Sequence, residues 1–299
     1  MADPERPDVS VVVVTLNGLP WLERCLESVA GAEAIVVDHG STDGTLELVR
    51  ERFPEVRVVE QPNVGMGGGN NAGMRVAKGR YFLLLNSDAW VVADGVERLV
   101  AFADAHPAAA VVGPKLLNTD GTLQRSVRGA PTLWRLATEY LFLRKLAPKS
   151  QLLNAFYAGG FAHDEVRAVE SLYGAALLVR RDAADEVGLF DEAFFMFSEE
   201  VDWLTRFREA GWQVLFFPGA EVVHVGGATH GGRLYAENLR GHLRWFAKHK
   251  GARQAEWARR LLLVSLRLRA LVWRGGERGA QTREGIRFLS SGSARALLG

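Results

Sequence analysis

Short runs of apolar, mostly β-branched residues alternate with helical patterns along the first third of the chain, and this alternation restricts the folds open to it. The run at residues 8–14 lacks polar–apolar alternation, which is typical of a strand buried on both faces. Further strands are predicted at residues 34–37, 56–59 and 81–85, and helices between them at residues 19–29, 45–53 and 71–78. Repeated strand–helix–strand units predict an α/β fold with a mainly parallel central sheet flanked by helices.

The rest of the chain divides into a less regular section and a helical end. Strands are expected at residues 110–113, 172–180, 214–217 and 222–225, with helices from about Asp182 and up to Gly211. Residues 121–170 carry few periodic signals. From about Tyr235 the pattern is helical, which predicts an α/β body over residues 1–232 and a C-terminal helical extension over residues 233–299.

Cysteine content and hydropathy set the expected compartment. Cys25 is the only cysteine, which excludes an internal disulfide framework and a cysteine-cluster metal site and favours a reducing cytosol. The N-terminal sequence has acidic residues and no apolar core, so we expect no signal peptide there. No uninterrupted apolar stretch of about 18 residues occurs, so no transmembrane helix is expected. These features predict a cytoplasmic protein.

Charge is distributed unevenly although the net charge is only +1. Residues 233–299 hold 15 Lys and Arg against four acids, so the remainder is acidic. Seven-residue spacings in this tail relate Arg260, Arg267 and Arg274, and likewise Trp257, Val264 and Leu271. They predict an amphipathic helix with a basic stripe, which favours an anionic membrane surface as partner. The alternatives for this helix are docking on the α/β body and binding of nucleic acid. Of these two, nucleic acid is not expected as a partner.

Polar residues follow three of the predicted strands where those strands end. Thr15 and Asn17 follow the first strand, residues 38–43 the second, and residues 86–88 the fourth. Ligands of parallel sheets bind beyond the carboxyl ends of the strands, so this arrangement predicts one site. Each cluster also has a purely structural interpretation: a polar turn at 38–45, or a helix N-cap at Asp88.

Three ordered segments, VVVVTLNG, VVDHGSTDGT and LLLNSDAWV, resemble the nucleotide-sugar motifs of family 2 glycosyltransferases of the GT-A fold. The resemblance continues in GAALLVRR and FFMFSEEVDWLTRFREAGW and is nearest to bacterial rhamnosyltransferases of cell-wall and surface-polysaccharide synthesis. It implies a catalytic domain over residues 1–232, with a nucleotide-sugar-binding part to about 115 and an acceptor-binding part over about 116–232.

The resemblance also implies a set of donor-binding residues. An acid in the position of Asp38 accepts a hydrogen bond from the pyrimidine base, and the glycine-rich segment 63–71, interpreted as a flexible loop, contacts the ribose and diphosphate. A loop without function is the alternative for that segment. The implied donor-binding set is Thr15, Asn17, Asp38, Ser41, Asp43, Asn63, Gly65, Asn70, Asn86, Ser87 and Asp88.

A metal site is implied in the same way. Asn86 stands where the family's DxD-type motif has its first acid, which leaves Asp88 as the single carboxylate. Relatives place a metal-binding histidine at the position of His224. The implied ligands of Mg²⁺ or Mn²⁺ are therefore Asp88, His224 and the diphosphate. A lone histidine is otherwise more often structural.

Three carboxylates at positions 199–202 repel one another unless a cation or a helix N-terminus offsets them. In relatives the second acid of this segment is the general base, which maps to Glu200, although this chain has Glu where relatives have Asp. Glu199 is the fallback, and Asp202 would support the acceptor or the metal shell. The implied acceptor-binding residues are Tyr173, Gly174, Ala175, Trp203 and Arg206.

The predicted function is an inverting transfer of a sugar, with rhamnose from dTDP-rhamnose as first choice, to a hydroxyl of a glycan or polyprenyl-linked acceptor. Galactofuranosyl, glucosyl and mannosyl transfer are the alternatives within the family. A nucleotidyltransferase and a non-catalytic sugar-nucleotide binder are the alternatives outside it, and the lack of Lys and Arg in VVVVTLNGLP argues against the former. The predicted location is the inner face of the cell membrane, peripherally associated, and a homodimer stays open.

Overall fold

The computed structural model describes residues 8–226 and 234–298, which fall into two compact units. A sheet unit takes in residues 8–127, 162–193 and 200–226. A helical unit takes in residues 128–161 and 194–199 together with the described residues from 234 onward. The predicted C-terminal extension thus shares a unit with residues 128–161.

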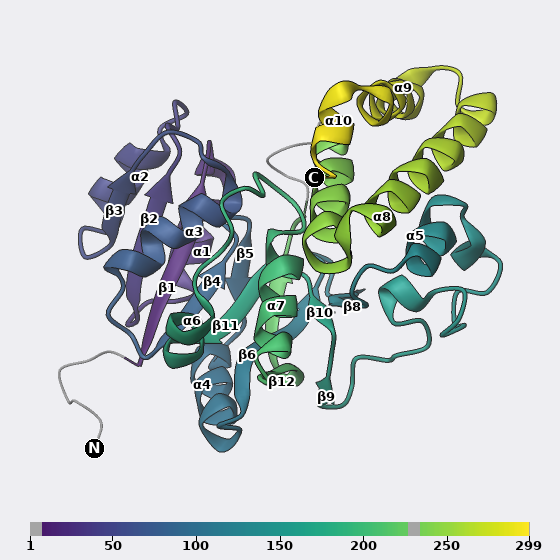
Figure 1. The fold of residues 1–299 in the computed structure, drawn as a ribbon. Coiled ribbons are helices and arrows are strands. Elements are labelled where there is room, and N and C mark those ends of the chain that lie inside the picture. Colours follow the sequence, from purple (N-terminus) through teal and green to yellow (C-terminus); the bar gives the residue numbers. More distant parts are fainter. Residues whose placement is uncertain (1–7, 227–233, 299) are drawn as a thin grey trace. The chain divides into compact units, whose positions relative to one another are not determined.

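The sheet unit is built on a mainly parallel sheet, as the sequence predicts (Figure 1). The strand order is β3-β2-β1-β4-β11-β6-β12-β5. β1 pairs in parallel with β2 and β4, whereas β11 is antiparallel to both of its neighbours. The strands of this path are β1 (Val9–Thr15), β2 (Glu33–Asp38), β3 (Arg57–Glu60), β4 (Tyr81–Leu85), β5 (Ala89–Val91), β6 (Ala109–Leu117), β11 (Ala176–Arg180) and β12 (Gln213–His224). Shorter strands are β7 (Leu123–Gln124), β8 (Val127–Arg128), β9 (Arg167–Ala168) and β10 (Ser171–Leu172).

Helices cover both faces of this sheet. Val11 and Val13 of β1 belong to a core that includes residues of α1, α2 and α4. Val12 and Val14 point the other way, toward α3, because side chains alternate along a strand. This two-sided burial explains why β1 has no polar residue at alternate positions. The helices of the unit are α1 (Leu19–Glu27), α2 (Thr45–Arg52), α3 (Gly65–Val76), α4 (Gly95–Ala105), α6 (Arg181–Val187) and α7 (Glu199–Glu209).

The glycine-rich segment is the clearest departure from the sequence prediction. The expected flexible loop is instead the first half of α3, which begins at Gly65, six residues before the predicted start. A Cβ added at Gly69 would lie 2.7 Å from Val14 Cγ1, and one at Gly73 would lie 2.3 Å from Val12 Cγ1. Glycine therefore serves close packing of α3 on β1, and not flexibility.

Two further boundaries differ from the predictions. The strands expected at 214–217 and 222–225 form one strand, β12, whose register against β6 shifts between Phe217 and Glu221. The strand expected at 172–180 is interrupted, because residues 173–175 lie between β10 and β11. Both differences arise from irregularities that hydropathy does not register, namely a bulge and a turn made of small residues.

Close packing of α3 predicts the effect of adding methyl groups there. Gly69→Ala and Gly73→Ala should each lower the free energy of unfolding by about 1–3 kcal/mol, because overpacking outweighs the helix propensity gained. Gly292→Ala is the control, since no heavy atom lies within 4 Å of its added Cβ. Urea unfolding of the three variants checks this, and equal stability for all three would contradict the packing argument.

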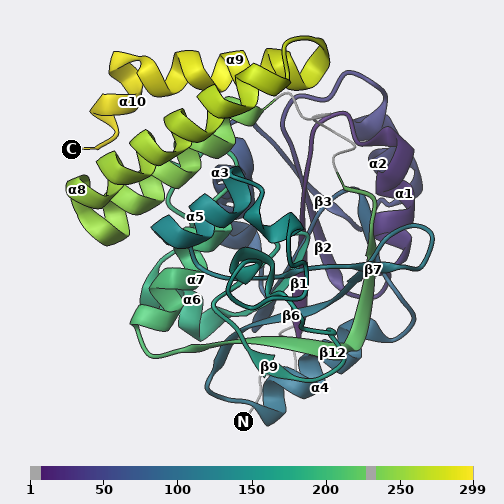
Figure 2. The same cartoon turned by 90° about the vertical axis from the view of Figure 1, so that its right-hand side faces the viewer.

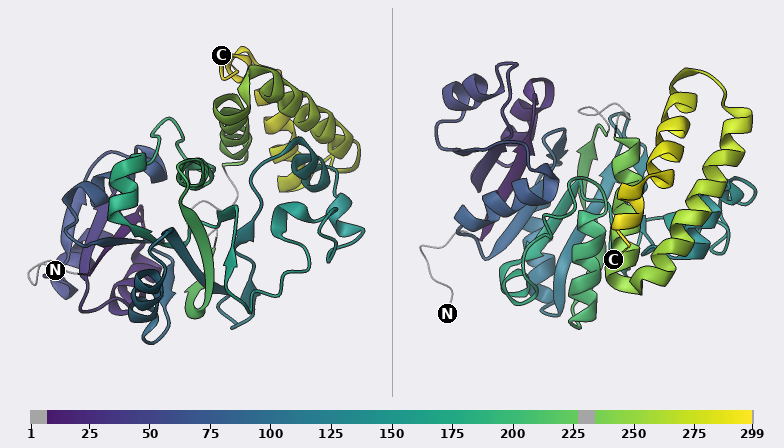
Figure 3. Two further views of the ribbon diagram at one scale, coloured as in Figure 1. Left: turned by 60° about the horizontal axis from the view of Figure 1, so that its bottom comes forward. Right: turned by 45° about the horizontal axis from the view of Figure 1, so that its top comes forward.

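The helical unit consists of short elements that pack around one long helix. α8 (Tyr235–Val272) changes direction at Gly251, which has φ +80°, and α9 (Gly276–Ser290) lies alongside it (Figures 2 and 3). α5 (Leu133–Tyr140) also packs on α8. The remaining elements are the 3₁₀ turns Leu143–Lys145 and Ala155–Tyr157 and α10 (Gly292–Ala296). Within the described residues, no helix has the length and apolar character to cross a membrane.

Polar contacts tie the predicted tail to the earlier segment of this unit. Arg269 of α8 donates to the carbonyl oxygens of Tyr140 and Glu139, at 2.9 and 3.2 Å, and its guanidinium lies over the Phe142 ring. His242 is buried against the rings of Tyr140 and Phe156. Burial, reinforced by the charge of Arg128, lowers the pKa of His242 to about 4.

This histidine makes the stability of the chain sensitive to pH. Because the pKa of His242 is lower when folded, the unfolded chain binds the extra proton as the pH falls below about 6.5. The contribution of His242 to stability is therefore fully present above about pH 6.5 and is lost progressively toward pH 4. Between pH 7 and pH 5 the free energy of unfolding should fall by about 2 kcal/mol more in the native chain than in His242→Phe. Urea unfolding at both pH values checks this, and equal losses would contradict it.

Candidate functional site

The ends of β1 and β2 bring the first two polar clusters together. Thr15 and Asp38 are register partners, each the last residue of its strand. Beyond them, the backbone N–H of Asn17 donates to Ser41 Oγ at 2.8 Å, and Asn17 Oδ1 accepts from the N–H of Thr42 at 2.9 Å. The convergence expected at this edge is therefore present for these two clusters.

Thr15 is the least explained polar group at this edge. Its side chain is buried, and its hydroxyl has no hydrogen-bond partner among the described residues. A Cβ added at Gly18 would come within 2.3 Å of that hydroxyl and 3.7 Å of Ser87 Cβ. Buried hydroxyls are nearly always satisfied, so an unpaired one in a glycine-lined turn suits a bound ligand.

One acid and two amides of the predicted donor set have local structural roles. Asp38 accepts from the N–H groups of Gly40 and Ser41, both at 2.9 Å, and also pairs with Ser41 Oγ. Asn63 Oδ1 accepts from the N–H of Gly65 at 3.0 Å, where the left-handed φ of +86° starts α3. Asn70 Nδ2 donates to the carbonyl of Met66 at 3.0 Å. The structural interpretation of the 38–45 turn is thus realised, and any donor contact must coexist with it.

Asp43 joins the starts of two helices. Its carboxylate accepts from the N–H of Leu19, the first residue of α1, at 3.2 Å, and from the N–H of Thr45, the first residue of α2, at 3.1 Å. Burial works to raise its pKa, but the hydrogen bonds from Thr45 and Leu19 outweigh burial and hold the pKa below its usual value. Asp43 is thus charged and fixed.

The third cluster meets His224 at the end of β12. His224 pairs with Ala89 of β5, so its ring reaches the preceding turn, where Nε2 lies 3.3 Å from Asp88 Oδ1 and 3.3 Å from Asn86 Nδ2. Both the imidazole and the carboxylate are buried. On the other side of the ring, Nδ1 lies 2.7 Å from Gln124 Oε1.

These contacts suit a cation. Gln124 Oε1 accepts a hydrogen bond from Nδ1–H, which orients the imidazole with Nε2 toward Asp88, and a metal-bound histidine is usually held in this way. Burial works to raise the pKa of Asp88, but the bond and charge of His224 and the N–H of Gly226 outweigh it and lower the pKa. The described residues contain no group of three or more His, Cys, Asp or Glu side chains that could hold a metal. A cation here therefore needs ligands from the substrate as well.

The turn between β10 and β11 adjoins this pair. The Tyr173 ring lies 5.5 Å from the His224 ring, and the backbone N–H of Asn86 donates to the carbonyl of Ala175 at 2.9 Å. A Cβ added at Gly174 would lie 3.5 Å from Glu200 Cγ. Residues 173–175 thus adjoin both the Asp88–His224 pair and Glu200. Ala175 is fully buried, backbone included.

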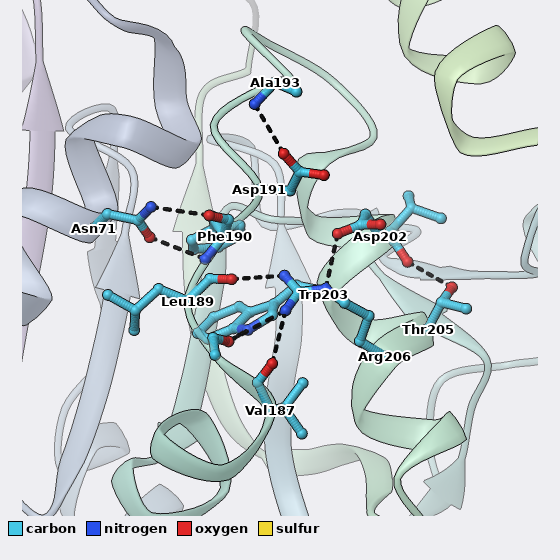
Figure 4. A network of polar contacts seen from close by, with 12 residues as sticks. Asn71, Val187, Leu189, Phe190, Asp191, Ala193, Asp202, Trp203, Thr205 and Arg206 are labelled. Atoms are coloured by element: carbon cyan, nitrogen blue, oxygen red, sulfur yellow. Dashed lines mark hydrogen bonds and ion pairs between the residues drawn. The ribbon is translucent and has the colours of Figure 1, made fainter. Parts of the chain in front are cut away.

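The remaining predicted acceptor residues have structural roles instead. Asp202 is fully buried and accepts from Arg206 Nε at 2.9 Å, while Arg206 donates to the carbonyls of Val187, Gly188 and Leu189 (Figure 4). Trp203 is fully buried and donates from Nε1 to the Gly188 carbonyl at 2.7 Å. The assignment of Trp203 to acceptor binding stays a prediction, and in this structure the Trp203 side chain is buried. Arg206, held by Asp202, anchors the 187–189 segment.

Asn71, which the sequence analysis did not single out, holds the other side of the same segment. Its amide exchanges two 3.0 Å hydrogen bonds with the N–H and carbonyl of Phe190, and its Nδ2 also donates to Glu192 at 2.9 Å (Figure 4). Asn71 thereby ties helix α3 to the segment that leads into α7. No local sequence pattern predicts this contact, which spans 119 positions, or the contact between Gln124 and His224, which spans 100.

The residues directly before the acids of α7 have a strained backbone. Phe197 and Ser198 have φ values of +67° and +70°, which non-glycine residues rarely adopt in succession. Within the helical unit, Gly241 of α8 lies against this segment, because an added Cβ would stand 2.6 Å from the Phe197 carbonyl oxygen. The chain then enters α7 with Glu199 and Glu200 at its start.

Comparison with known proteins gives consistent results. The family described as glycosyl transferase family 2 matches residues 10–163. The chain is 32% identical to the N-acetylglucosaminyl-diphospho-decaprenol L-rhamnosyltransferase of Mycobacterium tuberculosis, with 86% of this chain and 88% of that protein covered.

Two solved structures share the fold. The mannosyltransferase PcManGT from Pyrobaculum calidifontis, in complex with GDP-Man and Mn²⁺, has a TM-score of 0.58 at 20% identity, covering 98% of this chain and 83% of its own. GalNAc-T7 with UDP, GalNAc and Mn²⁺ has a TM-score of 0.57 at 18% identity, covering 82% of this chain and 48% of its own. At these identities the likeness concerns the fold, which is GT-A.

The anchoring role of Asp202 can be tested by removing its charge. Asp202→Asn should lower the free energy of unfolding by about 1.5–3 kcal/mol, because a buried charge-assisted hydrogen bond to Arg206 is weakened. Asp185→Asn, at an exposed position in the same unit, should change it by less than about 0.5 kcal/mol. Thermal and urea unfolding distinguish these outcomes, and equal stability of the two variants would overturn the anchoring role.

Proposed function

Because the chain belongs to glycosyl transferase family 2 and is a glycosyltransferase enzyme, we propose that its sheet unit transfers a sugar from a nucleoside diphosphate to an acceptor hydroxyl with inversion. One observation carries this proposal. A buried Asp88–His224 pair and the Glu200 side chain both adjoin residues 173–175. A cation-binding group and a carboxylate base beside one glycine-containing turn would serve a single displacement.

The donor would lie along the sheet edge. The unpaired Thr15 hydroxyl, together with Asn17 and the Asp38–Ser41 turn, would bind the nucleoside. Asp38 would keep its three turn hydrogen bonds, and a carboxylate oxygen has further lone pairs with which to accept from a base N–H. Ser87 adjoins the turn at Gly18. Ser87 and Asn86 would therefore lie next along the donor, toward its diphosphate.

Mg²⁺ or Mn²⁺ fits the chemistry of Asp88 and His224, which would hold it together with diphosphate oxygens. A bound cation would neutralise the charge of the departing nucleoside diphosphate. Gln124 would fix the histidine tautomer, and Asn86 would contribute an amide where relatives have a carboxylate. This set is neutral apart from one acid, so the diphosphate would supply the remaining negative charge.

Glu200 would take the proton from the acceptor hydroxyl as that oxygen attacks the anomeric carbon. The bond that breaks joins this carbon to the diphosphate oxygen, which leaves on the opposite face, so inversion results. Gly174 would leave room for the acceptor beside the Glu200 side chain, where a methyl group would make ordinary van der Waals contact. Glu199, the fallback base, precedes it at the start of α7.

The donor and acceptor are proposed from the relatives. The mycobacterial relative is named for rhamnosyl transfer to a diphospho-decaprenol-linked sugar. We therefore place dTDP-rhamnose first as donor, ahead of UDP-galactofuranose, UDP-hexoses and GDP-mannose, and a polyprenyl-linked glycan as acceptor in cell-wall or surface-polysaccharide synthesis. Peripheral association with the inner face of the membrane follows from such an acceptor.

Removal of the proposed base should separate binding from chemistry. Glu200→Gln should lower kcat by about 10²- to 10⁴-fold while the donor Kd stays within about two-fold, because only proton transfer is lost. Glu51→Gln, at an exposed position on α2, should leave both unchanged. Unaltered turnover in Glu200→Gln would contradict the assignment, and donor binding without turnover in the native chain would favour the non-catalytic alternative.

Removal of Gln124, which orients His224, should weaken metal binding specifically. Gln124→Leu should raise the Kd of Mn²⁺, measured by calorimetry in the presence of dTDP, by about 10- to 100-fold. Gln151→Leu, at an exposed position of the helical unit, is the control. An unchanged Mn²⁺ affinity in Gln124→Leu would exclude His224 as an oriented ligand.

A further inference from the structure

The outward side of α8 carries a row of exposed apolar side chains. Trp257 and Val264 are each 53% exposed and Leu268 is 51% exposed, while Leu271 and Val272 reach 67% and 77%. We call these five residues the apolar row. They succeed one another at intervals of seven, four, three and one positions, which places them on one side of a helix over about 22 Å.

A second set of exposed side chains runs beside it. Arg260, Arg267 and Arg274 are exposed and recur every seven residues, offset by three positions from the members of the apolar row at 257, 264 and 271. We call them the arginine row. The sequence from 257 to 276 contains five arginines and no acid. The nearest acid, Glu256, already binds Arg259 at 2.7 Å and Arg260 at 2.6 Å.

The fold of the helical unit does not need the apolar row. The opposite side of α8 is buried through Ala255, Ala258, Leu262 and Leu266. There Gly285 of α9 approaches Leu266, since an added Cβ would lie 2.6 Å from its Cδ1, and Arg259 donates to the Leu289 carbonyl at 2.7 Å. Five large apolar side chains in a line on the free side cost solubility without gain in packing, which marks an interaction surface.

The two rows together select the kind of partner. An apolar row flanked on one side by arginines, of which Arg260 is paired with Glu256, matches the boundary between lipid head groups and acyl chains. A second copy of the same face would bring two arginine rows together and is disfavoured by repulsion. Nucleic acid would use the arginines but gain nothing from burying Val264, Leu268 and Leu271.

We propose that the segment from Trp257 to Arg274, which comprises the end of α8 and the two residues after it, docks the chain on an anionic bilayer, with the helix lying in the surface plane. The apolar row enters the acyl boundary and the arginine row pairs with lipid phosphates. The proposal deepens the membrane association of the proposed function by naming the docking surface, but its test does not depend on transfer activity.

The test is flotation of the full chain with vesicles of phosphatidylcholine, alone or mixed with phosphatidylglycerol. The native chain should float with the anionic vesicles, and less so at high salt. Val264→Glu/Leu268→Glu should lower the binding constant at least about ten-fold, since the apolar row then resists insertion. Each Arg→Gln change at 260, 267 or 274 should lower it by about five-fold.

The matched control is Leu146→Glu/Leu152→Glu, which changes two exposed leucines of the same unit outside α8, 78% and 65% exposed. It should float like the native chain. Calorimetry of dTDP with Mn²⁺ on every variant separates failure of docking from failure of the proposed donor site, because α8 variants should bind nucleotide normally. Fluorescence of Trp257, isolated by difference against Trp257→Phe, should shift to shorter wavelength on binding.

Two results would overturn the proposal. One is flotation of Val264→Glu/Leu268→Glu equal to that of the native chain. The other is a native chain that does not float with anionic vesicles, whether it is a monomer or a dimer. A dimer that Leu268→Glu disrupts would assign this face to a second copy of the chain instead.

Discussion

The proposed chemistry of the site depends on the contact between Asp88 and His224, which sheet register creates. His224 ends β12 opposite Ala89 of β5, so its imidazole reaches a turn that lies 136 positions earlier in the chain. A slip of one residue would turn His224 to the other face of the sheet. The bulge in β12 after Phe217 therefore matters for the proposed site, because it sets which residue faces Asp88.

The helix that carries Glu200 is held by a different set of interactions. Arg206 binds three consecutive carbonyls and the buried Asp202, and Asn71 binds the backbone of Phe190 from α3. Residues 187–190 are thus fastened to both α7 and α3 through their backbone groups. Preorganisation of this kind would keep the proposed base, Glu200, within reach of its substrate, where small displacements reduce rate strongly.

The sequence predicts the sheet well because burial on both faces produces unbroken runs such as residues 11–14, and strand ends then fix where polar clusters meet. It fails where one residue type serves two purposes. The glycine-rich segment suits a flexible loop, yet Gly69 allows α3 to lie against Val14, as Gly73 does against Val12. Hydropathy does not show such close approach between distant segments.

The site residues also divide into those that the sequence predicts and those that it does not. Asp88 and His224 stand at predicted strand ends and lie together as expected. Trp203 and Arg206 occur in a segment similar to family motifs, but a motif records that residues recur and not whether they contact substrate or backbone. Gln124 and Asn71 act through contacts more than 99 positions away, for which no local pattern exists.

In the helical unit, one side of α8 packs on α9 and the other side is exposed. In the sheet unit, His224 and Asp88 are proposed to bind a divalent cation together with a nucleoside diphosphate. Pulsed EPR of Mn²⁺ with dTDP and the native chain should therefore show nitrogen coupling from one imidazole, and this coupling should disappear in His224→Ala. Mn²⁺ bound without nitrogen coupling, or with coupling unchanged in His224→Ala, would rule out His224 as a ligand.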